Sequence, residues 1–338
     1  MSYAQTLTRL INGESLSFDV MQALMQQVMS GELTAAQIAG ALVALRIKGE
    51  TVDEIAAAAS VMRSLSTKVE IQDAQYLVDT CGTGGDGIQT FNISTVSAFI
   101  AAAAGAKVAK HGGRSVSSTC GSADVLEALG VNVNLSPEQV ANTVNQVGLG
   151  FMFAPNHHSA MKHAAPVRRE LGIRTLFNLL GPLTNPASAK RQVMGVFSRE
   201  LTAKLAHVLK QLGSEHVMVV CGADGMDEIS FTGDTYVAEL KHGEVLEYTL
   251  NPTQFGLNLH ELSSIKVSNA QESKDIILDL LAGKTGPARD IVLLNAGAAI
   301  YVSGVTTTLA DGIKAAANML DNGQAMQKLQ ALIAASNA

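Results

Sequence analysis

The sequence predicts an α/β protein in which a small, discontinuous helical domain accompanies a larger α/β domain with a mostly parallel central sheet flanked by helices. Residues 1–70 show helical periodicity with clear end signals. From about residue 74, short apolar runs that end in glycine alternate with helical stretches, and a further helical stretch interrupts the alternation at 161–180. We therefore expect 1–70 to form the helical domain with 161–185 packed on it, and 71–160 and 186–338 to form the α/β domain.

Capping residues bound the expected N-terminal helices. Thr34 stands three residues before Gln37, and Thr51 stands three residues before Glu54. In such a capping box the hydroxyl and the later side chain each satisfy a free N–H of the first turn. Glycines at 31 and 49 follow apolar helical runs and suit the left-handed end of a helix. The first part of the chain therefore reads as a helical bundle.

The α/β alternation starts with a strand, loop, helix and strand between residues 74 and 113. Helices are expected at 94–104, 201–212 and 273–282. Strands are expected in the runs "QYLVD", "AKVAKHGG", "VNVNL", "FMFAP", "RQVMGVF", "HVMVVCGADG" and "DIVLLNAG". Because parallel strands end at one edge of a sheet, the loops that follow them are expected to gather there as a ligand site.

Charge and composition argue against a nucleic-acid partner. The chain of 338 residues has a formal net charge of -6 and no clustered run of Lys and Arg. It has no Trp and only 4% aromatic residues, which leaves little for stacking on bases. The expected ligand is therefore a small molecule.

The sequence also gives no sign of export or of a membrane partner. The N-terminus lacks a basic segment followed by an apolar core. The longest apolar run, 93–109, contains Ser, Thr, Gly and Lys and falls short of a span of about 20 apolar residues. Three cysteines without paired spacing are expected to be reduced thiols of a cytoplasmic protein.

Two expected loops carry features of anion binding. The stretch "DTCGTGGDG" at 79–87 is rich in glycine, and a helix begins directly after it at Asn92–Thr95, so that free N–H groups face an anion from both. The stretch at 110–122 supplies Lys110 and Arg114 as phosphate clamps, with hydroxyl donors at Ser117, Ser118 and Ser122. Either composition also occurs in loops that bind nothing, and Ser or Thr at a helix start is often only a cap.

Adjacent acids follow a third expected strand, at Asp227 and Glu228. They could be ordinary solvated carboxylates. If they converge with the two anion loops, they indicate magnesium, which prefers one or two carboxylates together with substrate phosphates and water. A metal would also explain why the glycine loop itself contains acids.

Other catalytic chemistries receive less support from the sequence. The histidines at 157, 158 and 163 lack the spacing of a helical zinc pair. No Gly-x-Ser-x-Gly elbow is present, and Cys81 has no assignable base. On the helix expected after residue 160, Arg168 and Arg169 form either a solvated face or a fork for a substrate carboxylate.

The motifs "DTCGTGGDG", "FNIST", "KHGGRSVSS", "GSADVLEALG", "FAPNHHSAMKH", "VRRELGIRTLFNLLGPLTNP" and "GADGMDEIS", in this order, closely resemble the anthranilate phosphoribosyltransferase family. The resemblance runs over nearly the whole chain. It implies a homodimer with the fold of the pyrimidine nucleoside phosphorylases. It also implies Mg²⁺-dependent transfer of the 5-phosphoribosyl group from phosphoribosyl pyrophosphate to the amine of anthranilate, in tryptophan biosynthesis.

The resemblance also assigns roles to residues, and it names no general base. The residues implied to bind phosphoribosyl pyrophosphate are Gly82, Gly85, Asp86, Thr90, Asn92, Ile93, Ser94, Thr95, Lys110, His111, Gly112, Gly113, Arg114, Ser117, Ser118 and Ser122. Those implied to bind anthranilate are Gly82 and Arg168. Those implied to hold the metal are Ser94, Asp227 and Glu228.

The chain departs from the family pattern at two positions. Gly113 stands where the family usually has an Asn whose side chain touches anthranilate. Gly113 offers only backbone groups, so we expect weaker or altered recognition of the acceptor. Ser159 replaces a Pro that is frequent in the family.

Two alternative functions remain at this point. A pyrimidine nucleoside phosphorylase would share the fold and a glycine-rich loop but would use inorganic phosphate without a magnesium-bound diphosphate. A non-catalytic nucleotide-sensing or nucleic-acid-binding relative is the second alternative. The acid pair and "GTGGDG" favour the transferase over the first, and the acidic net charge argues against the second.

Overall fold

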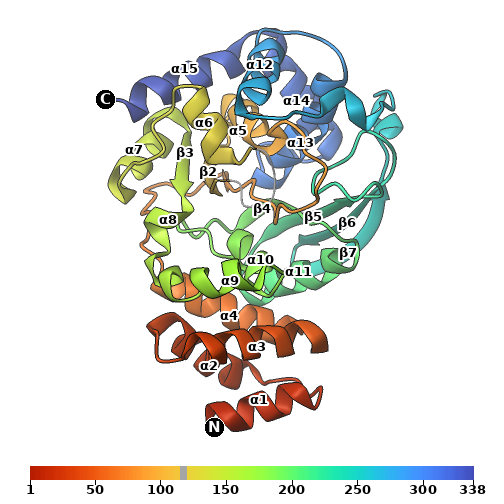
Figure 1. The fold of residues 1–338 in the computed structure, drawn as a ribbon. Coiled ribbons are helices and arrows are strands. Elements are labelled where there is room, and N and C mark those ends of the chain that lie inside the picture. The colour runs from red at the N-terminus through yellow and green to blue at the C-terminus, as the bar shows by residue number, and fades with distance from the viewer. Residues whose placement is uncertain (115–119) are drawn as a thin grey trace.

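The computed structural model of the protein describes residues 1–114 and 120–338, with the N-terminal helices stacked at one end (Figure 1). These helices are α1 (Tyr3–Ile11), α2 (Phe18–Ser30), α3 (Ala35–Lys48) and α4 (Val52–Leu65). Both predicted capping boxes are confirmed, at the starts of α3 and α4. Gly31 ends α2 at φ 80°, and Gly49 ends α3 at φ 84°, as the sequence indicated.

The strands form two sheets that meet at one bridge. β1 (Leu77–Val78), β2 (Lys107–Gly112) and β3 (Leu149–Phe153) pair in parallel. β4 (Arg191–Gly195) and β5 (His216–Gly222) also pair in parallel, and β6 (Thr235–Lys241) and β7 (Glu244–Leu250) continue antiparallel. A parallel bridge between Asp79 and Gln192 joins the sheets just beyond β1. The predicted α/β fold class is confirmed, and the antiparallel hairpin β6–β7 is an addition to it.

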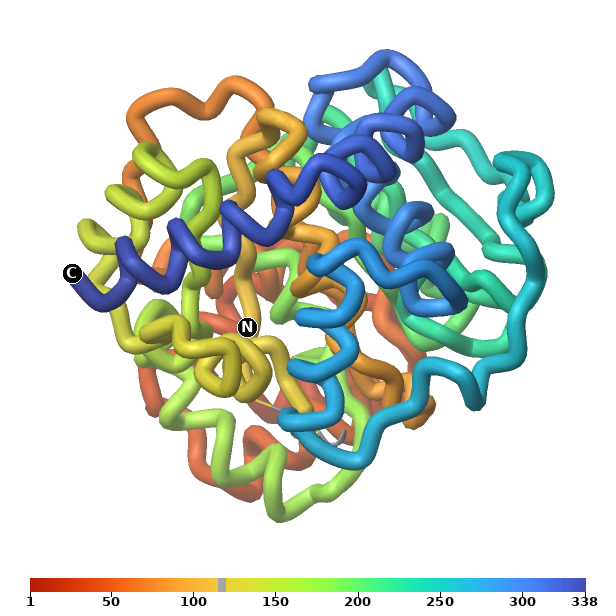
Figure 2. The backbone as a smooth tube through the Cα atoms, turned by 90° about the horizontal axis from the view of Figure 1, so that it is seen from above, coloured from red at the N-terminus to blue at the C-terminus, as the bar shows by residue number. Residues whose placement is uncertain are grey.

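Helices cover both sides of the strands (Figures 1 and 2). On one side α5 (Ile93–Ala103) packs against α13 (Pro287–Ser303), α14 (Leu309–Asp321) and α15 (Gln324–Ser336). The same side carries α6 (Ser122–Ala128), α7 (Pro137–Val147) and α12 (Ala270–Leu281). On the other side α11 (Glu200–Gln211) lies between β5, β6 and α4.

Two predicted strands are wrong. The run "DIVLLNAG" lies inside α13, whose residues from Ile291 to Ile300 are all buried, so its continuous apolar run has no polar face to reveal helical periodicity. The run "VNVNL" forms no strand, although Val131, Val133 and Leu135 are buried alternately. Its alternation reflects packing of an extended segment onto the core without sheet pairing.

The expected helix at 161–180 is also wrong as one element. It is divided into η1 (Ser159–His163), α9 (Ala165–Leu171) and α10 (Phe177–Leu180), preceded by α8 (Ala154–His157) and followed by η2 (Gly181–Leu183). Gly172 ends α9 at φ 63°, in the left-handed conformation that stops a helix. The remaining short helices are η3 (Pro252–Phe255) and η4 (Leu262–Ile265).

These short helices share a hydrophobic cluster with the N-terminal bundle. Val167 of α9 and Phe177 of α10 belong to the cluster that includes Ile38 of α3 and Ile55 of α4. The same cluster continues through α11 to the face of β5 that packs against α11. The division into two domains at 70, 160 and 186 stays a prediction. Among the described residues no helix has the length and apolar content to cross a membrane.

Candidate active site

The loops that follow β1 and β5 meet at the carboxyl edge of the sheets. A Cβ added to Gly82 would lie 3.0 Å from the backbone oxygen of Gly195, at the end of β4, and 3.2 Å from Asp227 Oδ2. A side chain at this position would force Gly195 or Asp227 to shift, so glycine favours the close approach of this loop. The glycine loop and the acid pair, predicted as parts of one site, therefore lie together.

The acid Asp227 contacts the glycine loop directly. The backbone N–H of Gly84 donates to Asp227 Oδ2 at 2.8 Å. Asp86, from the same loop, places its charge near Asp227 and accepts the N–H of Ile88 at 3.1 Å through Oδ1. Burial first, and then the neighbouring charge of Asp86, raises the pKa of the Asp227 carboxyl. Gly85 has φ 79°, within this same turn.

Glu228 contacts the start of α5. The backbone N–H of Ser94 donates to Glu228 Oε1 at 3.1 Å. Burial, followed by the charge of Asp227, raises the pKa of Glu228 well above its usual range. The two half-buried carboxyls are adjacent in sequence, and Asp86 adds the charge of a third acid beside Asp227, so a cation bound here would be stabilised by its neighbours.

The other residues of the predicted "FNIST" contact have structural partners. Asn92 Nδ2 donates to the backbone oxygen of Cys120 at 3.2 Å, and Asn92 Oδ1 accepts from Ser273 Oγ at 2.7 Å. The backbone N–H of Asn92 also donates to Ser273 Oγ, at 3.1 Å. Ile93 and Thr95 are buried, and Thr90 forms a bridge with Lys266. The side chain of Asn92 thus ties the start of α5 to the end of the second loop.

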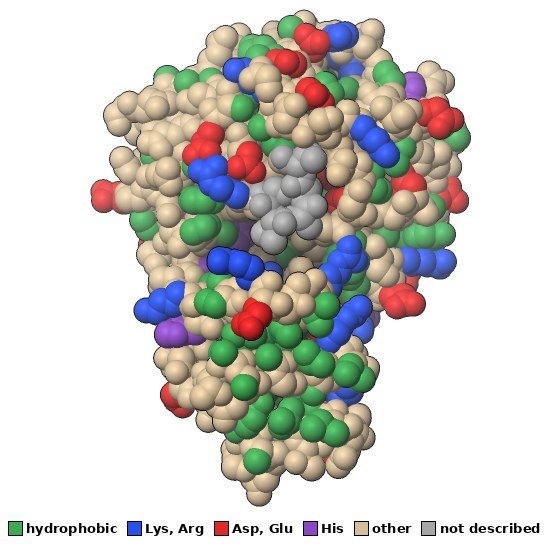
Figure 3. All heavy atoms as spheres, viewed as in Figure 1, with side chains coloured by type: hydrophobic (Ala, Val, Ile, Leu, Met, Phe, Trp, Pro, Cys, Tyr) green, Lys and Arg blue, Asp and Glu red, His purple; other side chains and the backbone are tan. Residues whose placement is uncertain are grey.

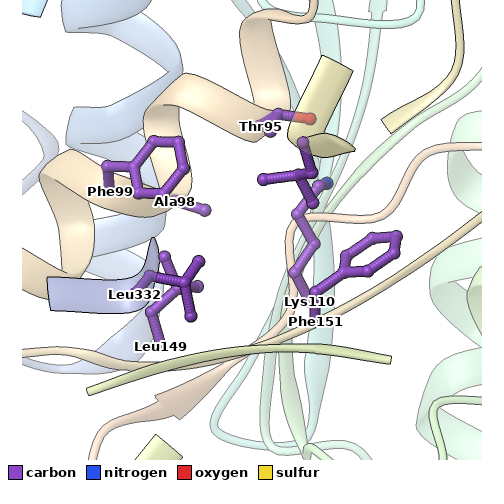
Figure 4. Close-up of a pocket in the computed structure, with 8 residues that line it drawn as sticks. Thr95, Ala98, Phe99, Lys110, Leu149, Phe151 and Leu332 are labelled. Atoms are coloured by element: carbon purple, nitrogen blue, oxygen red, sulfur yellow. The ribbon is translucent and has the colours of Figure 1, made fainter. Parts of the chain in front are cut away.

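Lys110 lies beneath the start of α5 rather than at the surface. Its Nζ donates to the backbone oxygen of Thr80 at 2.6 Å and to Ser94 Oγ at 3.2 Å. Its aliphatic stem lines a small, mostly apolar cavity of about 10 Å³ with Phe99 and Phe151 (Figure 4). This position places a positive charge behind Ser94 and Glu228.

The second loop is partly described. A Cβ at Gly112 would meet Ser122 Oγ at 2.3 Å, whereas a Cβ at Gly113 would meet nothing within 4 Å. Arg114 forms two hydrogen bonds to the carboxylate of Glu127, at 2.6 and 2.8 Å, and one to Asp124 at 3.0 Å. The predicted residues Ser117 and Ser118 lie outside the described residues.

Neutral histidines stand beside this loop. The ring nitrogens of buried His111 have no hydrogen-bond partner within residues 1–114 and 120–338. Burial, followed by the charges of His158 and His157, lowers the pKa of His111 to about 3, so its ring stays neutral. The ring of His158 lies 5.1 Å from it. Across the described ranges, no three His, Cys, Asp or Glu side chains form a metal cluster.

Arg168, the predicted partner of the anthranilate carboxylate, lies on α9 with its guanidinium 5.4 Å above the ring of Phe177.

A second arginine, to which the sequence assigned no function, reaches the glycine loop. Arg174 donates to the backbone oxygen of Gly85 and stacks 4.1 Å above the ring of Phe197. Arg174 lies in the quoted motif "VRRELGIRTLFN", but the sequence assigned it no function. Ser273 lay 181 residues from Asn92 and gave no signal.

The residues present fit a magnesium ion by their chemistry. Asp227, Glu228 and the hydroxyl of Ser94 are all oxygen donors, the type that this cation prefers. Two carboxylates alone do not complete a coordination shell, so the remaining positions would fall to water and substrate phosphates. The observation that supports the fit is the placement of these oxygen donors, with Asp227 held at the glycine loop by Gly84 and Glu228 held at the start of α5 by Ser94.

A helical bundle, an α/β domain and glycine-rich loops beside paired acids are the architecture of a glycosyl transferase family. The helical bundle domain of a glycosyl transferase family matches residues 4–66, and the a/b domain of a glycosyl transferase family matches 74–326. Both matches follow the order of the structural parts described above.

Curated relatives narrow this class. The anthranilate phosphoribosyltransferase of Methylobacillus flagellatus is 68% identical over 98% of this chain and 97% of that protein. The enzyme of the same name from Chromobacterium violaceum is 61% identical over 98% and 96%. The chain belongs to the anthranilate phosphoribosyltransferase family, and the resemblance seen in the sequence is confirmed.

Solved structures agree. The anthranilate phosphoribosyltransferase of Thermus thermophilus superposes with a TM-score of 0.93 at 43% identity, over 98% of this chain and 99% of that one. The Saccharomyces cerevisiae protein in complex with PRPP and Mg gives a TM-score of 0.90 at 28% identity, over 99% and 98%. The fold of this chain is therefore that of the family over its whole length.

Proposed function

We propose that the protein transfers the 5-phosphoribosyl group of phosphoribosyl pyrophosphate to the amine of anthranilate, giving N-(5-phosphoribosyl)anthranilate and pyrophosphate. The observation that carries the proposal is the meeting of the glycine loop, the start of α5 and the acids Asp227 and Glu228 in one place. Such a site suits a diphosphate that arrives with a divalent cation. The yeast relative was solved with PRPP and Mg.

The donor residues act by positioning and by charge. In the reaction, the bond from the anomeric carbon to pyrophosphate breaks and a bond to the anthranilate nitrogen forms, through an oxocarbenium-like transition state. Bound Mg²⁺ supplies neutralisation of the charge that grows on pyrophosphate. Ser94, Asp227 and Glu228 would hold it, and Lys110 adds a fixed positive charge beside Ser94. The glycine loop and the first turn of α5 orient the phosphates.

The acceptor needs no strong base. The aromatic amine of anthranilate is neutral at pH 7, so its proton is lost to water during or after attack. Arg168 would pair with the anthranilate carboxylate through its planar fork. Neutral His111 lies beside Gly112 and Gly113 and would add no charge to the acceptor site. The rate is expected to come mainly from alignment of the two substrates.

The proposal is tested by mixing the protein with phosphoribosyl pyrophosphate, Mg²⁺ and anthranilate and following the loss of anthranilate fluorescence. We expect loss that depends on all three additions. Phosphorolysis of uridine or thymidine, with no loss of anthranilate, would instead support the nucleoside phosphorylase. Tight binding of nucleic acid without turnover would support the non-catalytic alternative.

A second measurement tests the metal assignment. The double variant Asp227→Asn with Glu228→Gln keeps the shape of both side chains and removes both negative charges. We expect its turnover at limiting Mg²⁺ to fall by at least about tenfold, since each carboxylate contributes a charged ligand. Unchanged turnover would show that these acids do not hold the metal.

We further infer that the protein is a cytoplasmic homodimer. The three free thiols, Cys81, Cys120 and Cys221, fit a reducing compartment. Apolar side chains gather on the N-terminal helices (Figure 3), where Ile11 on α1 is 69% exposed and Ile47 on α3 is 82% exposed. A second copy of the chain would cover this face.

A further inference from the structure

Both acids of the site accept backbone N–H groups from the elements expected to bind the donor's phosphates. Asp227 Oδ2 accepts from Gly84 in the glycine loop at 2.8 Å. Glu228 Oε1 accepts from Ser94 in the first turn of α5 at 3.1 Å. These are the kinds of N–H group through which glycine loops and helix N-termini bind anions. Each carboxylate thus stands where an anionic ligand would accept a hydrogen bond.

Three neighbouring N–H groups, those of Thr83, Asn92 and Thr95, already have partners within the protein. The N–H of Thr83 donates to the backbone oxygen of Gly195 at 2.8 Å, and that of Asn92 donates to Ser273. The N–H of Thr95 donates to the backbone oxygen of Asn92 at 3.1 Å. An incoming diphosphate that needs the N–H groups of Gly84 and Ser94 must therefore replace a carboxylate at each.

A divalent cation changes this competition. Carboxylates that coordinate a cation turn their charge toward it, and their hold on the N–H groups weakens. The same cation neutralises part of the charge on the diphosphate. A bare diphosphate has neither advantage, because it meets two carboxylates and two N–H groups that already have partners.

We propose that Asp227 and Glu228 determine donor specificity, excluding the free diphosphate and admitting its magnesium complex, by occupying the N–H groups of Gly84 and Ser94. The inference rests on the proposed function for the identity of the donor. It gives the two acids a second role beside metal binding. Loss of an acid should weaken binding of the magnesium complex and strengthen binding of the bare anion.

Occupation of the N–H groups can be separated from simple charge repulsion. Glu228→Gln removes the charge but keeps an oxygen that can accept from Ser94, whereas Glu228→Ala removes both. Asp227→Asn and Asp227→Ala form the same pair at Gly84. If charge alone excludes the bare anion, the amide and alanine variants will bind it equally. If occupation matters, each alanine variant will bind it more tightly than its amide partner.

The experiment is calorimetric titration of the full-length protein with inorganic pyrophosphate, once with Mg²⁺ and once with a chelator. Glu247→Gln, an exposed acid on β7, is the control for net charge. We expect the wild type to bind the magnesium complex at least about tenfold more tightly than the bare anion. Each alanine variant should bind the bare anion about tenfold more tightly than the wild type does, the value of one hydrogen bond to a charged group.

The inference is overturned if the wild type binds both forms equally, or if alanine variants bind the bare anion no more tightly than their amide partners. Thermal melting identifies a variant that fails to fold, and the pair at the other acid then decides. Pyrophosphate binding also separates this inference from the proposed function. A wild type that shows the expected binding pattern but transfers no phosphoribose to anthranilate contradicts the proposed function alone.

Discussion

At the scale of single residues, Gly82 is a position in the glycine loop with little room for a side chain. Its missing Cβ would lie 3.0 Å from Gly195 oxygen and 3.2 Å from Asp227 Oδ2, so a methyl group must push the glycine loop or the acid aside. We expect Gly82→Ala to raise the KM for phosphoribosyl pyrophosphate about tenfold through this displacement. Steady-state kinetics with the donor varied measures it.

Gly233→Ala is the matched control for that variant, since a Cβ there meets nothing within 4 Å. Its KM for the donor should equal that of the wild type. A Gly82→Ala enzyme with unchanged donor KM would show that the close approach is not needed for donor binding.

Gly113 offers the opposite case, because a side chain has space there. We expect Gly113→Asn to lower the KM for anthranilate roughly threefold to tenfold, the value of one added hydrogen bond. Kinetics with the acceptor varied measures it, and donor KM serves as the internal control. A raised anthranilate KM would contradict the role given to this position.

The sequence could predict those site residues whose type and immediate sequence neighbours already indicate their chemistry. The glycine loop and the acids Asp227 and Glu228 were predicted together and lie together. Lys110 was expected as a phosphate clamp, and the structure buries it behind Ser94 with three oxygen partners. Ser273 could not be predicted, since only the fold brings it to Asn92.

At the scale of elements, α13 shows why a pattern can mislead. A helix covered on every side loses the polar stripe that distinguishes it from a buried strand. Length was the remaining signal, and the 17 residues of α13 far exceed an ordinary strand. The hairpin β6–β7 was missed for another reason. Its strands follow the loop that carries Asp227 and Glu228 with no helix between, and the turn residues His242 and Gly243 link them.

One carboxylate on β6 links three other elements. Glu239 Oε1 lies 2.8 Å from His216 Nε2 of β5 and accepts from the hydroxyl of Tyr301 of α13 at 2.8 Å. Glu239 Oε2 accepts from the hydroxyl of Tyr248 of β7 at 2.7 Å, and Lys241 donates to the Tyr301 hydroxyl. Burial alone would raise the pKa of Glu239, but these hydrogen bonds lower it below the ordinary 4.5.

This network predicts a dependence of stability on pH. A carboxyl whose pKa is lowered by folding stabilises the protein above its unfolded value of 4.5, and that contribution is lost as pH falls through the folded pKa. We expect Glu239→Gln to lower the free energy of unfolding at pH 7, with the difference from wild type shrinking below about pH 4. Urea unfolding at several pH values measures it. A constant difference would contradict the assignment.

At the scale of the whole molecule, donor binding is expected to bring the parts closer together. Arg168 lies on α9, which packs on α3, while the donor loops belong to the sheets. For Arg168 to reach an acceptor beside the donor, the helical part must close on the α/β part. We expect a smaller radius of gyration with phosphoribosyl pyrophosphate and Mg²⁺ than with Mg²⁺ alone. Identical solution scattering would contradict closure.

If the proposed dimer forms through the N-terminal helices, the exposed side chain of Ile47 on α3 should lie in the interface. Introducing a charge at Ile47 should separate the copies, because burying an unpaired charge is costly. We expect Ile47→Glu to convert the dimer to a monomer in analytical ultracentrifugation. Leu246→Glu is the control, since this side chain on β7 is 61% exposed and lies outside the N-terminal helices. A wild type that sediments as a monomer would overturn the proposal.

The bridge between Asp79 and Gln192 has a consequence for how the molecule opens. The two sheets are tied there by the N–H of Asp79 to Arg191 oxygen and the N–H of Val193 to Asp79 oxygen, both at 3.0 Å. The glycine loop starts at this junction, so the loop can change shape only as far as the junction holds. Exchange of these two amide hydrogens with deuterium reports separation of the two sheets. Slow exchange would show that the junction stays closed and anchors the start of the glycine loop.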